Sequence, residues 1–207
     1  MRYSLGHKAG TRKKIVTAAC RCLKERGIKG TGVCELMKLA GLTHGGFYMH
    51  FASKDALVIE AIVHSLEESR QSFDRWGRMA PEDKQPLHAI IDNYLSFGHR
   101  ENVPMGCPMP TLGADVARSG AATKAAATAK LEEIIRVLGR YVAGGTQRER
   151  EKIAIGLLAG IVGAMLLARA TDRALSDQFL AVTAQFLKDA IVRGDMPRRL
   201  GTQVREN

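Results

Sequence analysis

Apolar side chains recur at helical spacing along most of the chain. The periodic segments cover residues 11–27, 33–40, 43–51, 53–73, 86–99, 111–118, 122–142, 147–170 and 176–192. Repeats of three and four residues indicate amphipathic helices, and no stretch alternates with the period of two of a half-buried strand. The pattern therefore predicts an all-α protein, with loose residues before position 11.

The first helical segments have the lengths and connections of a helix-turn-helix. Gly27 is placed to stop the first helix, and Thr31 to cap the second. Gly41 begins a tight turn, Thr43 is placed to cap the third helix, and Ser53 to cap the fourth. Two short helices joined by a glycine-containing turn, behind a supporting helix, define this motif.

Charge divides the chain near residue 54. Residues 1–54 hold 11 Lys and Arg against 2 Asp and Glu, a net charge of +9, whereas residues 55–207 hold 20 against 19. A basic module on a nearly neutral body indicates a polyanion partner, with nucleic acid ahead of a membrane surface. We predict a helix-turn-helix DNA-binding domain over 1–54 and a helical-bundle domain for ligand binding, regulation and dimerisation over 55–207, ending in a disordered tail, 194–207.

The stretch AGLTHGGFYMHF, residues 40–51, contains two histidines and two glycines and invites other interpretations. His44 and His50 are six residues apart, so on a helix they lie about 120° away from a shared face, which is poor geometry for a metal pair. The glycines match neither a P-loop nor a dinucleotide-binding loop. We expect no metal and no cofactor.

Other classes of protein also fit poorly. No nucleophile motif or carboxylate pair marks an enzyme, and none of the four cysteines forms a CxxC pair. The N-terminus has no secretory apolar region, and the longest apolar run, Ile153–Ala168, has 16 residues where a membrane span needs about 20. We expect a reduced, cytoplasmic chain that does not insert into a membrane.

Residues 11–57 resemble the DNA-binding head of the TetR-type (TetR/AcrR) transcriptional regulators. The turn glycine, the cap, the aromatic and histidine residues and the Ser-Lys pair of AGLTHGGFYMHFASKDAL stand in the order of that family. The segment GCPMPTLGADVARSG is similar to one found in a subgroup. The resemblance implies a homodimer that binds a pseudo-palindromic operator and is released by a small-molecule effector of unknown identity.

The resemblance also places individual residues in the expected site. Phosphate contacts fall on Thr43, Tyr48, His50 and Lys54, base-facing positions fall on His44, Gly45 and Gly46, and Thr31 completes the DNA-binding set. Five of these residues have a plainer alternative. The glycines could avoid a clash with the neighbouring helix, Tyr48 could be core, and His50 and Lys54 could be solvated surface residues.

The body offers two further candidate sites. Small residues of the 147–170 helix and an apolar stripe on the last helix predict a dimer interface of Gly156, Gly160, Gly163, Phe179, Val182 and Phe186, or else an intramolecular core. Large apolar side chains predict a ligand pocket of Phe73, Trp76, Tyr94, Phe97, Met105, Cys107 and Met109, all of which could be ordinary core.

The predicted function is therefore a ligand-responsive repressor. Two alternatives remain open. Cys107 precedes a predicted helix, where a lowered pKa would make it a thiol sensor of electrophiles or oxidants that releases DNA when modified. The protein could also bind DNA constitutively, without an effector.

Overall fold

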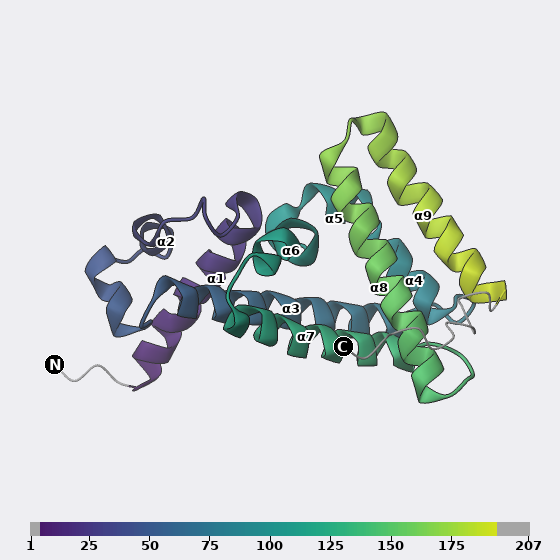
Figure 1. The fold of residues 1–207 in the computed structure, drawn as a ribbon, viewed down its shortest axis with the longest axis horizontal. Coiled ribbons are helices and arrows are strands. Elements are labelled where there is room, and N and C mark those ends of the chain that lie inside the picture. Colours follow the sequence, from purple (N-terminus) through teal and green to yellow (C-terminus); the bar gives the residue numbers. More distant parts are fainter. Residues whose placement is uncertain (1–4, 194–207) are drawn as a thin grey trace, which may run out of the picture. The chain divides into compact units, whose positions relative to one another are not determined.

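The computed structural model describes residues 5–193, and every regular element in that range is a helix. In chain order the elements are α1 (Leu5–Arg26), α2 (Val33–Leu39), the 3-10 helix η1 (His44–Met49), α3 (Lys54–Arg78), α4 (Pro86–Tyr94), α5 (Phe97–Glu101), the 3-10 helix η2 (Val103–Met105), α6 (Met109–Ala117), α7 (Ala121–Arg140), α8 (Gln147–Ala170) and α9 (Arg173–Arg193) (Figure 1). The expected all-α class is confirmed. The predicted tail, 194–207, lies outside the described residues.

The chain divides into two compact units. One unit combines Met1–Gln71 with Glu101–Glu132, and the other combines Ser72–Arg100 with Glu133–Asn207. The first unit therefore contains the predicted head together with η2, α6 and the start of α7. The predicted domain boundary at residue 54 stays a prediction.

Turn and cap residues define the head inside the first unit. Gly27 and Gly41 have φ angles of 74° and 72°, which only glycine adopts at little cost, and they end α1 and α2. The backbone N–H of Ala56 donates to the Ser53 hydroxyl at 3.1 Å and so caps α3 as expected. The head closes over a core that includes Ile15, Leu23, Leu36, Met37, Phe47 and Leu57, all at most 1% exposed.

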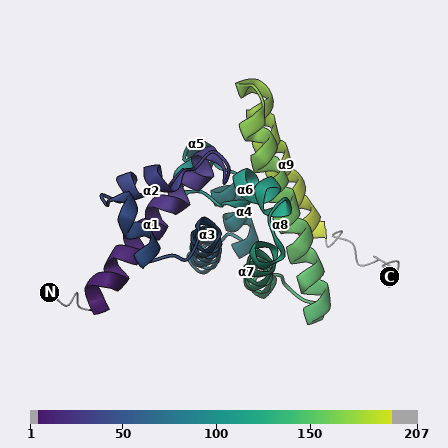
Figure 2. The same ribbon diagram turned by 60° about the vertical axis from the view of Figure 1, so that its left-hand side comes forward.

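An antiparallel pair, α8 and α9, dominates the second unit (Figure 2). Helix α8 begins with a capping box, in which the Thr146 amide donates to the Glu149 carboxylate at 2.7 Å and the Glu149 amide donates to the Thr146 hydroxyl. By length and composition alone, α8 is apolar enough to cross a membrane. However, it packs on α9, and Ala154, Leu157 and Ile161 are buried.

Three expected boundaries were wrong. Helix α1 begins at Leu5, so residues 5–10 are helical rather than loose. Helix α3 runs on to Arg78, because the Tyr141 hydroxyl donates to Asp74 at 2.9 Å and the Tyr141 ring lies against the bare Cα of Gly77. The expected 86–99 helix breaks after Tyr94, and α5 restarts where the His99 amide donates to the Ser96 hydroxyl at 3.2 Å.

Candidate nucleic-acid interface

The third element of the head is a short 3-10 helix rather than the expected α-helix. Two consecutive glycines lower the helix propensity of a six-residue segment, and 3-10 geometry is common in such short pieces. Thr43 has the extended conformation of an N-cap, as predicted, but its side chain makes no capping hydrogen bond. Its exposed hydroxyl is therefore available to a partner outside the chain.

The two glycines of η1 are not required by the packing of the chain itself. A Cβ built on Gly45 meets no atom within 4 Å, and one built on Gly46 meets only ordinary contacts, the nearest being Met37 Cε at 3.7 Å. Neither glycine has a positive φ. Avoidance of a clash with the neighbouring helix therefore does not explain them, and the bare surface at Gly45 is left open to an external partner.

The side chains around this bare turn are exposed. Tyr48 is 68% exposed, so it is not a core residue, and its ring contacts Phe47 and His44 edge-on at centroid distances of 5.2 and 6.4 Å. Phe47 is fully buried and anchors the element to the head. Met49, which the sequence analysis did not single out, is 67% exposed. The exposed surface of η1 thus combines a histidine, a tyrosine and a methionine with a bare backbone.

Arg12 of α1 holds the end of η1 in place. Its guanidinium donates to the Glu60 carboxylate, with Nε at 3.0 Å from Oε1, and also to the carbonyl of His50. The same guanidinium lies 4.1 Å from the centre of the Phe51 ring. The sequence analysis missed Arg12, because nothing local links it to residues 38 and 48 positions further along the chain.

In the turn after α1, both the backbone amide and the backbone carbonyl of Ile28 are hydrogen-bonded to side chains. The Lys54 ammonium donates to the carbonyl of Ile28 at 2.8 Å, and the amide of Ile28 donates to the Asp115 carboxylate at 2.9 Å. This amide lowers the pKa of Asp115, and Arg118 lowers it further. Lys54 is therefore a tethered side chain rather than a solvated one, and Asp115 is a second residue that the sequence did not reveal.

The expected DNA contact at Thr31 does not fit its surroundings. Thr31 is fully buried, and its hydroxyl donates to the carbonyl of Gly27 at 2.8 Å. The N-cap of α2 is Gly32, so the expected cap at Thr31 was also wrong. His50 is half-buried, whereas Thr43, His44 and Gly45 are exposed.

Part of the expected ligand pocket forms an aromatic cluster in the second unit. Phe73 stacks on Tyr94 at a centroid distance of 5.5 Å, Trp76 meets Phe73 edge-on at 5.8 Å, and His99 meets Tyr94 at 4.5 Å. Phe97 does not join them; it is 56% exposed, with the Arg100 guanidinium 5.1 Å from its ring centre.

The other expected pocket residues belong to the first unit. Met105 is 60% exposed on η2, Cys107 is buried, and Met109 is half-buried. Exposure of Met105 and Phe97 does not fit the lining of an enclosed cavity. All four cysteines are unbridged, and the described residues contain no group of three or more His, Cys, Asp or Glu placed to hold a metal ion.

The expected dimer residues fall on two different faces. A Cβ on Gly160 would lie 3.3 Å from Leu187 Cδ2, so this glycine serves the contact between α8 and α9 within the chain. Gly156 is exposed, and a Cβ on Gly163 would meet no atom within 4 Å. Val182 and Phe186 are each 65% exposed, and Phe179 is half-buried.

Comparisons with known proteins agree with this geometry. Residues 15–61 match the family model of bacterial regulatory proteins of the tetR family. The HTH-type transcriptional regulator TtgR of Pseudomonas putida is 38% identical over 65 residues, which make up 31% of this chain and 30% of TtgR. The curated match therefore spans less than a third of the length of that relative.

Solved structures extend the likeness to the whole fold. A TetR transcriptional regulator from Chloroflexus aurantiacus aligns with a TM-score of 0.76 at 22% identity, over 91% of this chain and 98% of that one. FadR of Bacillus subtilis, in complex with stearoyl-CoA, aligns with a TM-score of 0.65 at 15% identity, over 88% and 98%. Residues 15–61 therefore match the head of the tetR family of bacterial regulatory proteins, and the fold resembles that of a solved TetR regulator.

Proposed function

We propose that the protein is a ligand-responsive transcriptional repressor that binds a pseudo-palindromic operator as a homodimer in the cytoplasm. One observation carries the DNA-binding part of this proposal. Gly45 leaves a bare, exposed turn that neither the packing nor the backbone of the chain requires. A partner that approaches the backbone of η1 closely accounts for it, and a duplex groove is such a partner.

The chemistry of η1 assigns different tasks to its residues. His44 is the one side chain of the first turn that carries ring nitrogens for base edges. Thr43 and Tyr48 present hydroxyls that suit phosphate oxygens. Because few side chains reach base edges here, phosphate positioning, DNA shape and the spacing of two heads supply much of the sequence preference.

Dimerisation is proposed through the outer face of α8 and α9. Exposed or half-buried small and apolar residues recur on each helix at alternating spacings of four and three, which is the repeat of a helix-packing seam. These residues are Ile155, Ala159, Val162 and Leu166 on α8, and Leu175, Phe179, Val182 and Phe186 on α9. An exposed apolar stripe of this kind fits a second copy of the same pair of helices.

The effector and its chemistry remain open to experiment. FadR, which shares the fold, holds stearoyl-CoA, and the aromatic cluster of Phe73, Trp76 and Tyr94 is an apolar candidate wall in this chain. The thiol-sensor alternative requires Cys107 to react, yet that side chain is only 5% exposed. Ligand release is therefore the function that we favour.

The proposal is tested by selecting duplexes from random sequence with the full chain, then screening compounds for release of the selected duplex. We expect a two-fold symmetric site, a complex containing two chains, and at least one compound that releases it. Failure to select any sequence would overturn the DNA-binding proposal. Selection without release by any compound would favour constitutive binding, and release only by electrophiles, abolished in Cys107→Ser, would favour the thiol sensor.

His44→Ala gives a residue-level test of the same site. We expect discrimination at one or two base pairs of the selected site to fall by about 1–3 kcal/mol. The measurement is competition binding against every single-base variant of the duplex. Equal discrimination at every position would show that His44 does not read bases.

A further inference from the structure

The recognition element contains no lysine or arginine. Residues His44–Met49 carry no formal charge with histidine neutral, while DNA affinity depends mostly on neutralised phosphates. Two residues expected to contact DNA are also engaged within the chain, because Thr31 is buried and the Lys54 ammonium binds the Ile28 carbonyl. The positive charge that holds a duplex must therefore come from another surface.

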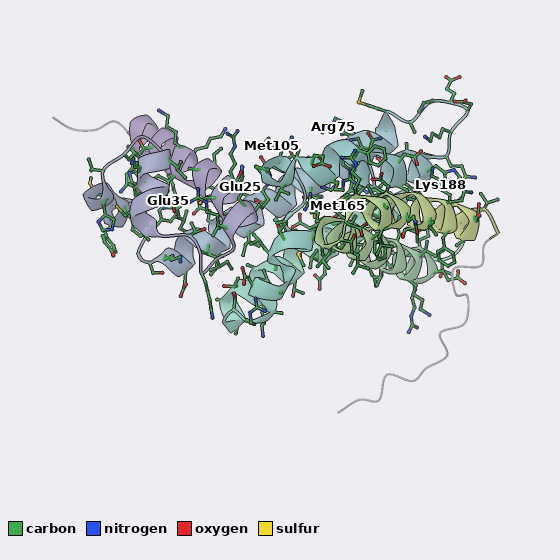
Figure 3. All side chains as sticks on the ribbon, turned by 90° about the horizontal axis from the view of Figure 1, so that it is seen from above. Glu25, Glu35, Arg75, Met105, Met165 and Lys188 are labelled. Carbon is green, nitrogen blue, oxygen red and sulfur yellow. The ribbon has the colours of Figure 1, made fainter. Side chains whose placement is uncertain are left out.

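A basic groove lies between α1 and the end of α2. It has a volume of about 650 Å³ and is lined by Gly10, Lys13, Lys14, Thr17, Ala18, Arg21, Cys22, Glu25, Leu39 and Ala40. Lys13, Lys14 and Arg21 are all exposed. Against these three cations stands a single acid, Glu25, near the end of α1 (Figure 3).

The three cations differ from others of the head in having no partner. Arg12 pairs with Glu60, Arg26 pairs with Glu35, and the Lys24 ammonium donates to the carbonyl of Gly106. Within the described part of the chain, by contrast, Lys13, Lys14 and Arg21 make no ion pair or hydrogen bond. No ion pair neutralises them, and all three lie along α1.

The row of three cations is long enough to reach more than one phosphate of a DNA strand. Lys13 and Arg21 are eight residues apart, which is about 12 Å along a helix. A strand of duplex DNA presents one phosphate per about 3.4 Å of its axis, so the row spans roughly three or four phosphates. Leu39 and Ala40, which form part of the wall of the groove, lie directly before the turn that leads into η1.

We propose that this groove is a docking surface for the phosphate backbone of DNA, separate from the residues that read bases. The inference rests on the proposed function and deepens it, since it divides the head into a nearly uncharged reading element and a charged holding groove. Contacts to phosphates carry no sequence information directly. The groove thus supplies affinity for any duplex, while η1, DNA shape and the spacing of two heads supply the preference among duplexes.

The test uses the full chain carrying Lys13→Gln, Lys14→Gln and Arg21→Gln together. Affinity for the selected duplex and for a scrambled duplex is measured over a range of salt concentrations. We expect the salt slope to become shallower by about 0.9 for each phosphate that the variant no longer neutralises. Both affinities should fall by the same factor, on the order of tenfold or more at low salt, and their ratio should stay constant.

Two further variants control for net charge and folding. Lys124→Gln, Arg136→Gln and Arg140→Gln remove the same charge from exposed positions of α7 and should leave the salt slope nearly unchanged. Glu25→Gln removes the acid of the groove and should raise affinity for both duplexes. It also removes a negative charge near the C-terminus of α1, where such a charge is unfavourable, so loss of fold is not expected.

Four results would overturn the inference. The salt slope of the groove variant could match that of the wild type, or the α7 control could lower it equally. If affinity fell only for the selected duplex, the groove would be assigned to base reading. If the groove variant kept its affinity for DNA but lost affinity for an anionic protein or small molecule, the groove would be assigned to that partner. If the wild-type chain binds no duplex at all, the proposed function fails as well. If the wild-type chain selects a duplex and the groove variant has the same affinity and salt slope, only this inference is overturned.

Discussion

Gly45 in the head and Gly160 in α8 look alike in sequence, since each is a glycine inside a helical segment. A Cβ at Gly45 would meet nothing within 4 Å, whereas a Cβ at Gly160 would lie 3.3 Å from Leu187 Cδ2. One glycine leaves space for a partner outside the chain, and the other lets a neighbouring helix of the same chain come close. The difference separates a binding role from a packing role.

The same contrast holds for charge in the two regions. In the head, Arg12, Arg26 and Lys54 are engaged by the chain itself, while Lys13, Lys14 and Arg21 are not. Between α8 and α9, by contrast, Gly160 lies against the apolar side chain of Leu187, a contact of shape rather than of charge. Groups that the fold does not use are therefore the informative ones for function.

The largest effect is expected from Gly160→Leu. The added side chain has no room against Leu187, and overpacking of this kind costs about 1–3 kcal/mol of unfolding free energy. Urea unfolding followed by circular dichroism measures the loss. Gly163→Leu is the matched control, because a Cβ there meets no atom of the chain. It should not destabilise the fold, but it should weaken self-association if that face of α8 binds a second copy.

If Gly45 serves an external partner rather than packing, Gly45→Leu should weaken DNA binding and leave stability nearly unchanged. We expect the unfolding free energy to stay within about 1 kcal/mol of the wild type, since leucine has the better helix propensity and a Cβ at this position meets no atom within 4 Å. Affinity for the selected duplex should fall at least tenfold, or about 1.4 kcal/mol. Fluorescence anisotropy and urea unfolding on the same preparation separate the two effects. A stability loss like that of Gly160→Leu would remove the distinction between the two glycines.

Local signals in the sequence account for most of the head. Gly27, Gly41 and Ser53 act through their own turns and caps, and a reader can recognise such signals from residue type and order. The division of charge at residue 54 likewise needed only counting. The helix-turn-helix and the all-α class were therefore predictable.

Long-range contacts account for most of what was missed. Asp115 holds a turn 87 residues away, and Arg12 binds Glu60 across 48 residues. No local pattern announces these pairs, and none announces that the Lys54 ammonium binds the carbonyl of Ile28 across 26 residues. The sequence also could not show which glycine of α8 faces α9, because that depends on the register between the two helices.

The smallest effect is expected at an ion-paired carboxylate in the first unit. A contribution from charge depends on pH, whereas a contribution from packing does not. Glu67 of α3 accepts from Arg70 at 2.7 Å and from Lys130 of α7 at 3.2 Å. The hydrogen bond from Arg70, followed by those from Gln71 and Lys130, lowers its pKa from 4.5 to about 2 despite partial burial. A depressed carboxylate pKa stabilises the fold above the unfolded pKa, and that stability is lost as the pH falls towards the folded pKa.

Glu67→Gln should therefore lower the unfolding free energy near neutral pH by about 1 kcal/mol or less, as for other partly exposed ion pairs. The difference from the wild type should shrink as the pH falls from about 4.5 towards 2. Urea unfolding at several pH values measures it, with Gly160→Leu as the reference. Because the defect at Gly160 is steric, its cost should not follow this titration. A Glu67→Gln defect that stays constant over the same pH range would show that packing, rather than charge, holds α3 to α7.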